Sequence, residues 1–129
     1  MHLHAALITT LNVLLLLLAT ILSGRARGRY QIKAPATTGH PDFERAFRAH
    51  QNTLEQSVLF LPLLWIAALY GNEQYAVWLG YAWLVGRVWY LFAYISPTGN
   101  RSAGFGIASA ASIALLLVSF IGLVPRLLA

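Results

Sequence analysis

Four long apolar runs, separated by short polar connections, dominate the pattern of this sequence. A helix rises about 1.5 Å per residue, so about 20 apolar residues cross the hydrocarbon core of a bilayer. The helices predicted from these runs cover residues 3–23, 43–70, 75–95 and 102–124. The sequence therefore predicts an all-α fold, an integral membrane four-helix bundle that forms one membrane domain over residues 1–129.

Glycine, proline and capping residues predict where these helices begin and end. Gly28 is expected to break any helix after the first run, and Asp42 is a candidate N-cap of the second. Pro62 should kink the second helix, and Pro125 should end the fourth. Small residues at four-residue spacing predict close packing of the fourth helix. They are Gly106, Ala110 and Ala114.

The first apolar run has a second interpretation, as a secretory signal peptide. In signal peptides the positive charges precede the apolar segment. Here the basic residues Arg25 and Arg27 follow it instead. We therefore expect this run to be a membrane-spanning helix of the folded protein.

Composition supports a membrane protein and narrows the chemistry. The sequence is 58% hydrophobic and 10% charged, whereas soluble domains are about 25% charged. The formal net charge of +5 would suit nucleic acid, but the apolar excess disfavours that partner. Because the chain has no cysteine, it has no thiolate nucleophile and no thiolate metal ligand. Any thiol chemistry has to come from a substrate.

The connections differ in charge, and this difference predicts a topology. The first and third connections carry basic residues, whereas the second, residues 71–74, carries Glu73 and no basic residue. The positive-inside rule therefore places the first and third connections in the cytoplasm and both termini outside.

The second helix begins with charged residues before it becomes apolar. Arg48, Asn52 and Glu55 are spaced i, i+4 and i+7, which places them on one helical face. Charges on a membrane-length helix are costly, and they indicate a functional site by default. The alternative is a structural ion pair of Glu55 with Arg48 or with Arg87 of the third helix.

Two other segments bring polar residues to the same side of the membrane. Arg87, Tyr90 and Tyr94 share one face near the end of the third helix, and Arg101 follows in the third connection. On the predicted topology they meet the head of the second helix at one depth, on the cytoplasmic side. Ordinary packing is the alternative role of the two tyrosines.

Cations outnumber anions in this polar set, which suits a ligand with several carboxylates. Glu55 suits an amino group, so a small zwitterionic peptide matches both kinds of charge. An arginine beside a thiol favours the nucleophilic thiolate. No second ligand is in register with His50, so no metal site is expected. The polar set is Arg27, Arg48, His50, Asn52, Glu55, Arg87, Tyr90, Tyr94 and Arg101.

Several segments resemble the MAPEG family, the membrane-associated proteins in eicosanoid and glutathione metabolism. Residues 43–55 are similar to the signature of the family's second helix, and residues 35–44 resemble the segment before it. Residues 85–90, followed by Tyr94, are similar to the third helix. Arg101 lies where the family has its catalytic arginine. The resemblance covers nearly the whole chain, with matching helix order and loop lengths.

The resemblance implies a homotrimer that binds glutathione, as co-substrate, between neighbouring subunits near the cytoplasmic face. Arg101 would stabilise the thiolate for attack on a lipophilic electrophile or lipid hydroperoxide. Arg27 and His50 would come from the adjoining subunit. Arg87 matches an arginine that some members need in the site and others use structurally. The residues that would line the site from one subunit are Arg48, Asn52, Glu55, Tyr90 and Tyr94.

Two other functions are compatible with four membrane helices. One is a non-catalytic lipid-binding scaffold, a role found within the same family. The other is a small drug/proton exporter in which Glu55 carries the proton. Such an exporter does not call for Arg48, Tyr94 and Arg101 beside its single acid, so a membrane-bound glutathione transferase is the favoured interpretation.

Overall fold

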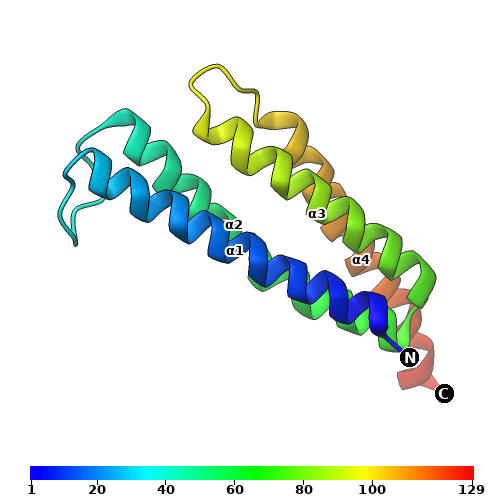
Figure 1. The fold of residues 1–129 in the computed structure, drawn as a ribbon. Helices are drawn as coiled ribbons and strands as arrows, with labels where there is room; N and C mark the ends of the chain where they lie inside the picture. The colour runs from blue at the N-terminus through cyan, green and yellow to red at the C-terminus, as the bar shows by residue number, and fades with distance from the viewer.

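The computed structural model describes residues 1–129 and contains four helices and no strands. They are α1 (Leu3–Arg29), α2 (Pro41–Tyr70), α3 (Glu73–Ile95) and α4 (Ser102–Leu128). Each helix is long and apolar enough to span a membrane. The predicted all-α membrane bundle is therefore confirmed, and Figure 1 shows its helices running side by side.

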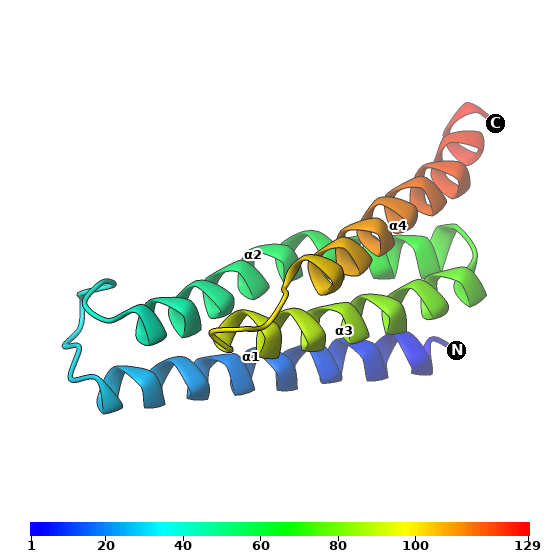
Figure 2. The same cartoon turned by 90° about the horizontal axis from the view of Figure 1, so that it is seen from above.

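The helices α2 and α3 form the centre of the bundle. Both α1 and α4 pack on these two helices, whereas α1 and α4 make no contact with each other. Phe60 of α2 stacks on Trp83 of α3 with ring centroids 3.9 Å apart, and both side chains are fully buried. Figure 2 shows α4 turning away from the other helices towards its C-terminal end.

The helix α1 is longer than predicted, because Gly28 does not break it. It ends at Arg29 and includes residues 24–29, which were expected to belong to a loop. A glycine inside a helix costs only about 1 kcal/mol relative to alanine and removes no hydrogen-bond donor. The chain leaves the helix at Tyr30, the C-cap, and Gln31, whose φ of 56° is left-handed.

The helix α2 begins at Pro41, and its N-cap is His40 instead of the predicted Asp42. The ring Nδ1 of His40 accepts a hydrogen bond from the backbone N–H of Asp42 at 3.1 Å. Proline suits the first helical position because its fixed φ is helical and its missing N–H is not needed there. Asp42 pairs with Arg45 and accepts a hydrogen bond from the Tyr30 hydroxyl at 3.0 Å, which ties the start of α2 to the end of α1.

Two prolines lie inside helices, and neither one ends its helix. Pro62 lies within α2, and α4 continues through Pro125 to Leu128, so the predicted end at residue 124 is wrong. The φ of proline is compatible with a helix, and each proline removes one backbone hydrogen bond. Near the end of α4 the final turn is still closed, because Ala129 donates to the carbonyl of Pro125 at 3.1 Å.

Glycines permit a close approach of α3 and α4, but they are not the ones predicted. A Cβ atom at Gly104 would lie 2.5 Å from the carbonyl oxygen of Gly86 and 2.6 Å from the backbone nitrogen of Tyr90. By contrast, Gly106 and Ala110 of the predicted stripe are exposed, and a Cβ atom at Gly106 would meet nothing within 4 Å. The packed face of α4 lies two residues away from the predicted one.

The two ends of the bundle carry different segments of the chain. Both termini lie at one end, and the connections of residues 30–40 and 96–101 lie at the other (Figure 1). Between the ends the outward faces are apolar; for example, Leu14 is 60% and Ile121 is 74% exposed. Apolar side chains on the outside of membrane-length helices are the expected surface towards lipid.

Candidate functional site

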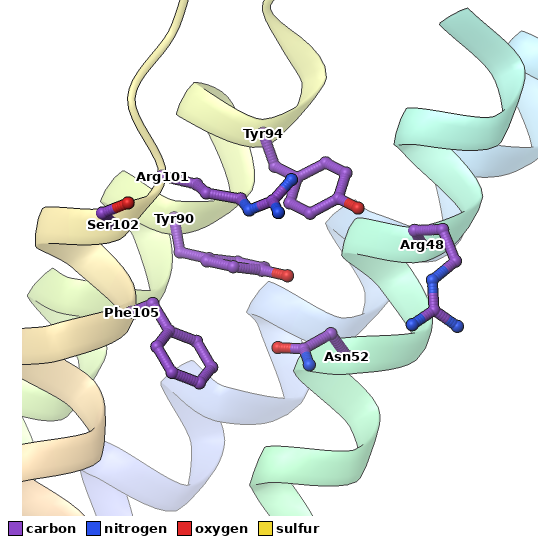
Figure 3. A pocket seen from close by; sticks show the side chains of 7 residues that line it. All are labelled: Arg48, Asn52, Tyr90, Tyr94, Arg101, Ser102 and Phe105. Carbon is purple, nitrogen blue, oxygen red and sulfur yellow. The ribbon is translucent and has the colours of Figure 1, made fainter. Parts of the chain in front are cut away.

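A cavity of about 350 Å³ opens between α2, α3 and α4, at the end that carries the two longer connections. Figure 3 shows side chains from three separate segments converging on it. The lining residues are Arg48, Asn52, Tyr90, Tyr94, Arg101, Ser102 and Phe105. The structure thus brings together the three polar loci that the sequence placed at one membrane depth.

Arg101 is held at the rim of this cavity, immediately before α4 begins. Its guanidinium carbon lies 4.4 Å from the centroid of the Tyr94 ring, a cation–π arrangement. Asn100 accepts a hydrogen bond from the backbone N–H of Ser102 at 2.9 Å, which fixes the turn around Arg101. Arg101 has no acidic partner in the chain, so its charge is available to a ligand.

Arg48 and Asn52 face the same cavity from successive turns of α2. Arg48 donates a hydrogen bond to the side-chain oxygen of Gln51 at 3.3 Å and has no acidic partner. Glu55, one further turn along, is exposed and does not line the cavity. It forms no ion pair with Arg48 or Arg87, so the structural ion pairs considered as an alternative are not formed.

Arg87 lies behind the cavity wall and does not line it. The residue is fully buried, and its guanidinium donates to the side-chain oxygens of Asn52 at 3.0 Å and Thr53 at 2.8 Å. Its guanidinium carbon is 3.9 Å from the centroid of the Tyr90 ring. Two of its nitrogens have no hydrogen-bond partner. The result is a buried cation with only neutral neighbours, directly beneath two residues that line the cavity.

Arg27 and His50 lie elsewhere in the chain. Arg27 donates to the carbonyl of Ala36 at 2.8 Å, and its guanidinium carbon lies 4.8 Å from the Phe43 ring centroid. His50 is within hydrogen-bond distance, 3.2 Å, of the Thr20 hydroxyl of α1. Neither residue lines the cavity, so within one chain they belong to the flank formed by α1 and α2.

Two lining residues were missed by sequence reasoning, Ser102 and Phe105. Ser102 directly follows Arg101 at the start of α4, and Phe105 lies four residues after Arg101, on the same side of the first turn. The Phe105 ring lies 6.1 Å from that of Tyr90 and closes the apolar side of the cavity. The four-residue spacing from Arg101 could have indicated Phe105, whereas no spacing indicates Ser102.

The electrostatics of the cavity favour an anion. Two arginines line it and no carboxylate does, so no internal acid competes with a negatively charged ligand. Hydroxyl groups and one amide supply neutral hydrogen-bonding partners. Tyrosine and phenylalanine rings supply apolar contact. This combination suits a small molecule that has negative charge, amide groups and some apolar surface.

Comparison with known proteins identifies the family of this chain. The model of the MAPEG family matches residues 5–121. The chain belongs to the MAPEG family. The resemblance inferred from the helix motifs is thereby confirmed, and four membrane-length helices in a MAPEG protein establish an integral membrane protein.

Individual MAPEG relatives match most of the chain. It is 42% identical over 122 residues to an uncharacterised protein of Synechocystis sp., which covers 95% of the chain and 89% of that protein. It is 37% identical over 100 residues to microsomal glutathione S-transferase 2 of Homo sapiens, covering 78% and 68%. It is 35% identical over 123 residues to leukotriene C4 synthase of Cavia porcellus, covering 95% and 82%.

Proposed function

We propose that the protein is a membrane-bound glutathione transferase. The observation that carries the proposal is the cavity in which Arg48 and Arg101, from different elements and without acidic partners, face Asn52, Tyr90 and Tyr94. Glutathione has two carboxylates, an amino group, two amides and a thiol, which these groups complement. Similarity to proteins named microsomal glutathione S-transferase 2 and leukotriene C4 synthase supports the same ligand.

Binding would use most of the polar set. Arg48 pairs with a glutathione carboxylate, and Asn52 and the tyrosine hydroxyls bind its amide groups. Glu55 is exposed next to the cavity-lining turns of α2, and it takes the amino group.

Arg27 and His50 complete the site from a neighbouring copy in a homotrimer, since within their own chain they contact Ala36 and Thr20 and do not line the cavity. On this proposal the cavity opens to the cytoplasmic side, and both termini lie on the other side.

The reactive step belongs to Arg101. Its guanidinium stabilises the negative charge of the sulfur, so the thiol releases its proton to solvent and the thiolate forms. The sulfur then donates an electron pair to an electrophilic carbon, and the leaving group departs with the bonding pair. With a lipid hydroperoxide, the thiolate attacks the terminal oxygen and the O–O bond breaks. The lipid leaves as an alkoxide and takes a proton from solvent to become an alcohol, while glutathione becomes a sulfenic acid. A second glutathione converts the sulfenic acid to a disulfide and water.

The detergent-solubilised protein tests this proposal. We expect glutathione-dependent turnover of a chlorinated aromatic electrophile or a lipid hydroperoxide, together with a glutathione-dependent rise in the thermal unfolding midpoint. Turnover without a thermal shift would still support an enzyme. Absence of both signals, combined with retained lipid binding, would instead identify a non-catalytic scaffold.

A further inference from the structure

A second cavity, of about 460 Å³, lies at the same end of the bundle, between the end of α1, the start of α2 and the end of α3. It shares no lining residue with the cavity that contains Arg101. None of the residues proposed to bind glutathione lines it either. Its walls therefore have no role in the proposed reaction.

Two arginines line this second cavity without acidic partners. Arg25 and Arg29 are spaced i, i+4, so both lie on one face of the last two turns of α1. Asp42 is the one acid in the wall, but its carboxylate pairs with Arg45 and accepts the Tyr30 hydroxyl. The cavity therefore carries uncompensated positive charge.

The other walls are apolar and continue towards the membrane. Leu22 and Ile95 line the cavity below the arginines, from α1 and α3 respectively. On α3, Phe92 and Val88 precede Ile95 by one and two turns and are 53% and 43% exposed. On α1, Leu14 lies two turns below Leu22 and is also exposed. An apolar two-helix surface thus leads away from the charged cavity.

The depth of the arginines matches a membrane interface. The helix α1 has 27 residues, whereas about 20 are enough to cross the hydrocarbon core. The surplus lies at its C-terminal end, because residues 3–22 contain no Asp, Glu, Lys or Arg, whereas Arg25, Arg27 and Arg29 follow them. Arg25 and Arg29 are therefore placed at the level of the lipid headgroups, with the apolar surface beside the acyl chains.

We propose that this cavity binds the headgroup of an anionic phospholipid from the surrounding leaflet. The two guanidinium groups, one helical turn apart, bind the phosphate through charge-assisted hydrogen bonds, and the acyl chains lie along the α1 and α3 surface. A free soluble anion would leave the apolar walls uncovered. A zwitterionic lipid would bring its own cation to a cavity that is already positive.

The double variant R25Q/R29Q tests the assignment. Wild-type protein is reconstituted in nanodiscs that contain phosphatidylglycerol and phosphatidylcholine. Native mass spectrometry of the released protein then measures the number of bound lipids and the number of protein copies in the same complex. We expect wild type to retain phosphatidylglycerol selectively. Each arginine near an anionic headgroup contributes about fivefold to affinity, so the double variant should lose about 25-fold.

The matched control is K33Q/R126Q, which removes the same formal charge. Lys33 lies at the same end of the bundle but outside this cavity, and Arg126 is near the C-terminus. Lipid retention should not change in the control. An equal loss in both double variants would mean a diffuse charge effect and would overturn the proposal.

Three further outcomes would also overturn the proposal. The first is equal retention of phosphatidylcholine by wild type. The second is complete displacement of the lipid by millimolar inorganic phosphate, which would indicate a soluble anion. The third is a changed number of protein copies in R25Q/R29Q with unchanged lipid, which would make this surface a contact between copies of the chain.

Discussion

Arginine side chains occupy two different environments in this bundle. Arg48 and Arg101 line a solvent-accessible cavity, whereas Arg87 is fully buried and has only neutral partners. A buried cation is costly in a membrane protein and is retained where it has a function. We infer that Arg87 acts through Asn52: by donating to the side-chain oxygen, it turns the NH₂ group of Asn52 towards the ligand.

Arg101→Ala should lower kcat more than it raises the KM for glutathione. The loss of a group that stabilises developing negative charge typically lowers kcat by about 100-fold or more. Steady-state kinetics measure both parameters, and ultraviolet absorbance of the bound thiolate should fall in parallel. Arg126→Ala, near the C-terminus, is the control and should keep wild-type kinetics. An unchanged kcat in Arg101→Ala would remove Arg101 from the reactive step.

Arg87→Met should raise the KM for glutathione by about tenfold, because the Asn52 amide loses the donor that orients it. Arg87→Lys should restore part of the affinity, since an ammonium group can still donate to one of the two oxygens. Thermal unfolding of the same variants separates a role of Arg87 in ligand binding from a role in stability. If both variants lose stability equally while the KM stays at the wild-type value, Arg87 is structural only.

At the scale of the helix, the α3–α4 contact positions Tyr90 against the cavity. Gly104 packs directly on the backbone at Gly86 and Tyr90, so this contact has no space for a side chain. Tyr90 therefore belongs both to the α3–α4 interface and to the wall of the cavity. A change in the spacing of α3 and α4 should alter the site as well as stability.

Gly104→Ala should destabilise the protein by about 1–3 kcal/mol through overpacking, and it should also lower turnover, because Tyr90 shifts. Gly106→Ala is the matched control two residues away. It should leave stability unchanged or raise it slightly, since a Cβ atom there meets nothing within 4 Å. Thermal unfolding in detergent measures both variants. Equal midpoints would contradict the packing argument.

The number and order of helices could be predicted from the sequence, because apolar length alone determines them in a membrane protein. The ends could not. Gly28 and Pro125 have local preferences that are worth a few kcal/mol at most, and the continuing helix outweighs them. The packed face of α4 was also missed, because four-residue spacing occurs on two faces of that helix and only the partner, Gly86, selects between them.

At the scale of the whole molecule, the site depends on elements that are distant in sequence. Polar groups are rare in apolar segments, and this singled out Arg48, Asn52 and Arg101 in the sequence. The structure brings the three residues to one cavity, and their role in binding a ligand stays a prediction. Spacing alone did not show that Arg87 is buried behind Asn52, since burial depends on how α2 and α3 are rotated against each other. Arg27 and His50 remain predictions for a trimer.

Co-expression of two inactive variants tests the trimer. One chain carries Arg101→Ala, and the other carries Arg27→Ala with His50→Ala. If each site takes residues from two neighbouring copies, random mixing in a closed ring leaves about a quarter of the sites intact, so activity should recover to that level. Mixing the two variants after separate purification, without exchange of subunits, is the control. Activity that stays at the level of the single variants would place the whole site in one subunit.

Both chain termini lie at the end of the bundle opposite the cavity with Arg101 (Figure 1). A peptide tag or a linker to a solid support at either terminus therefore lies across the membrane thickness from the site. The protein should tolerate immobilisation through its N- or C-terminus with the cavity facing the bulk solution. This geometry makes it suitable for a supported bilayer sensor, in which ligand is supplied and washed away from the free side.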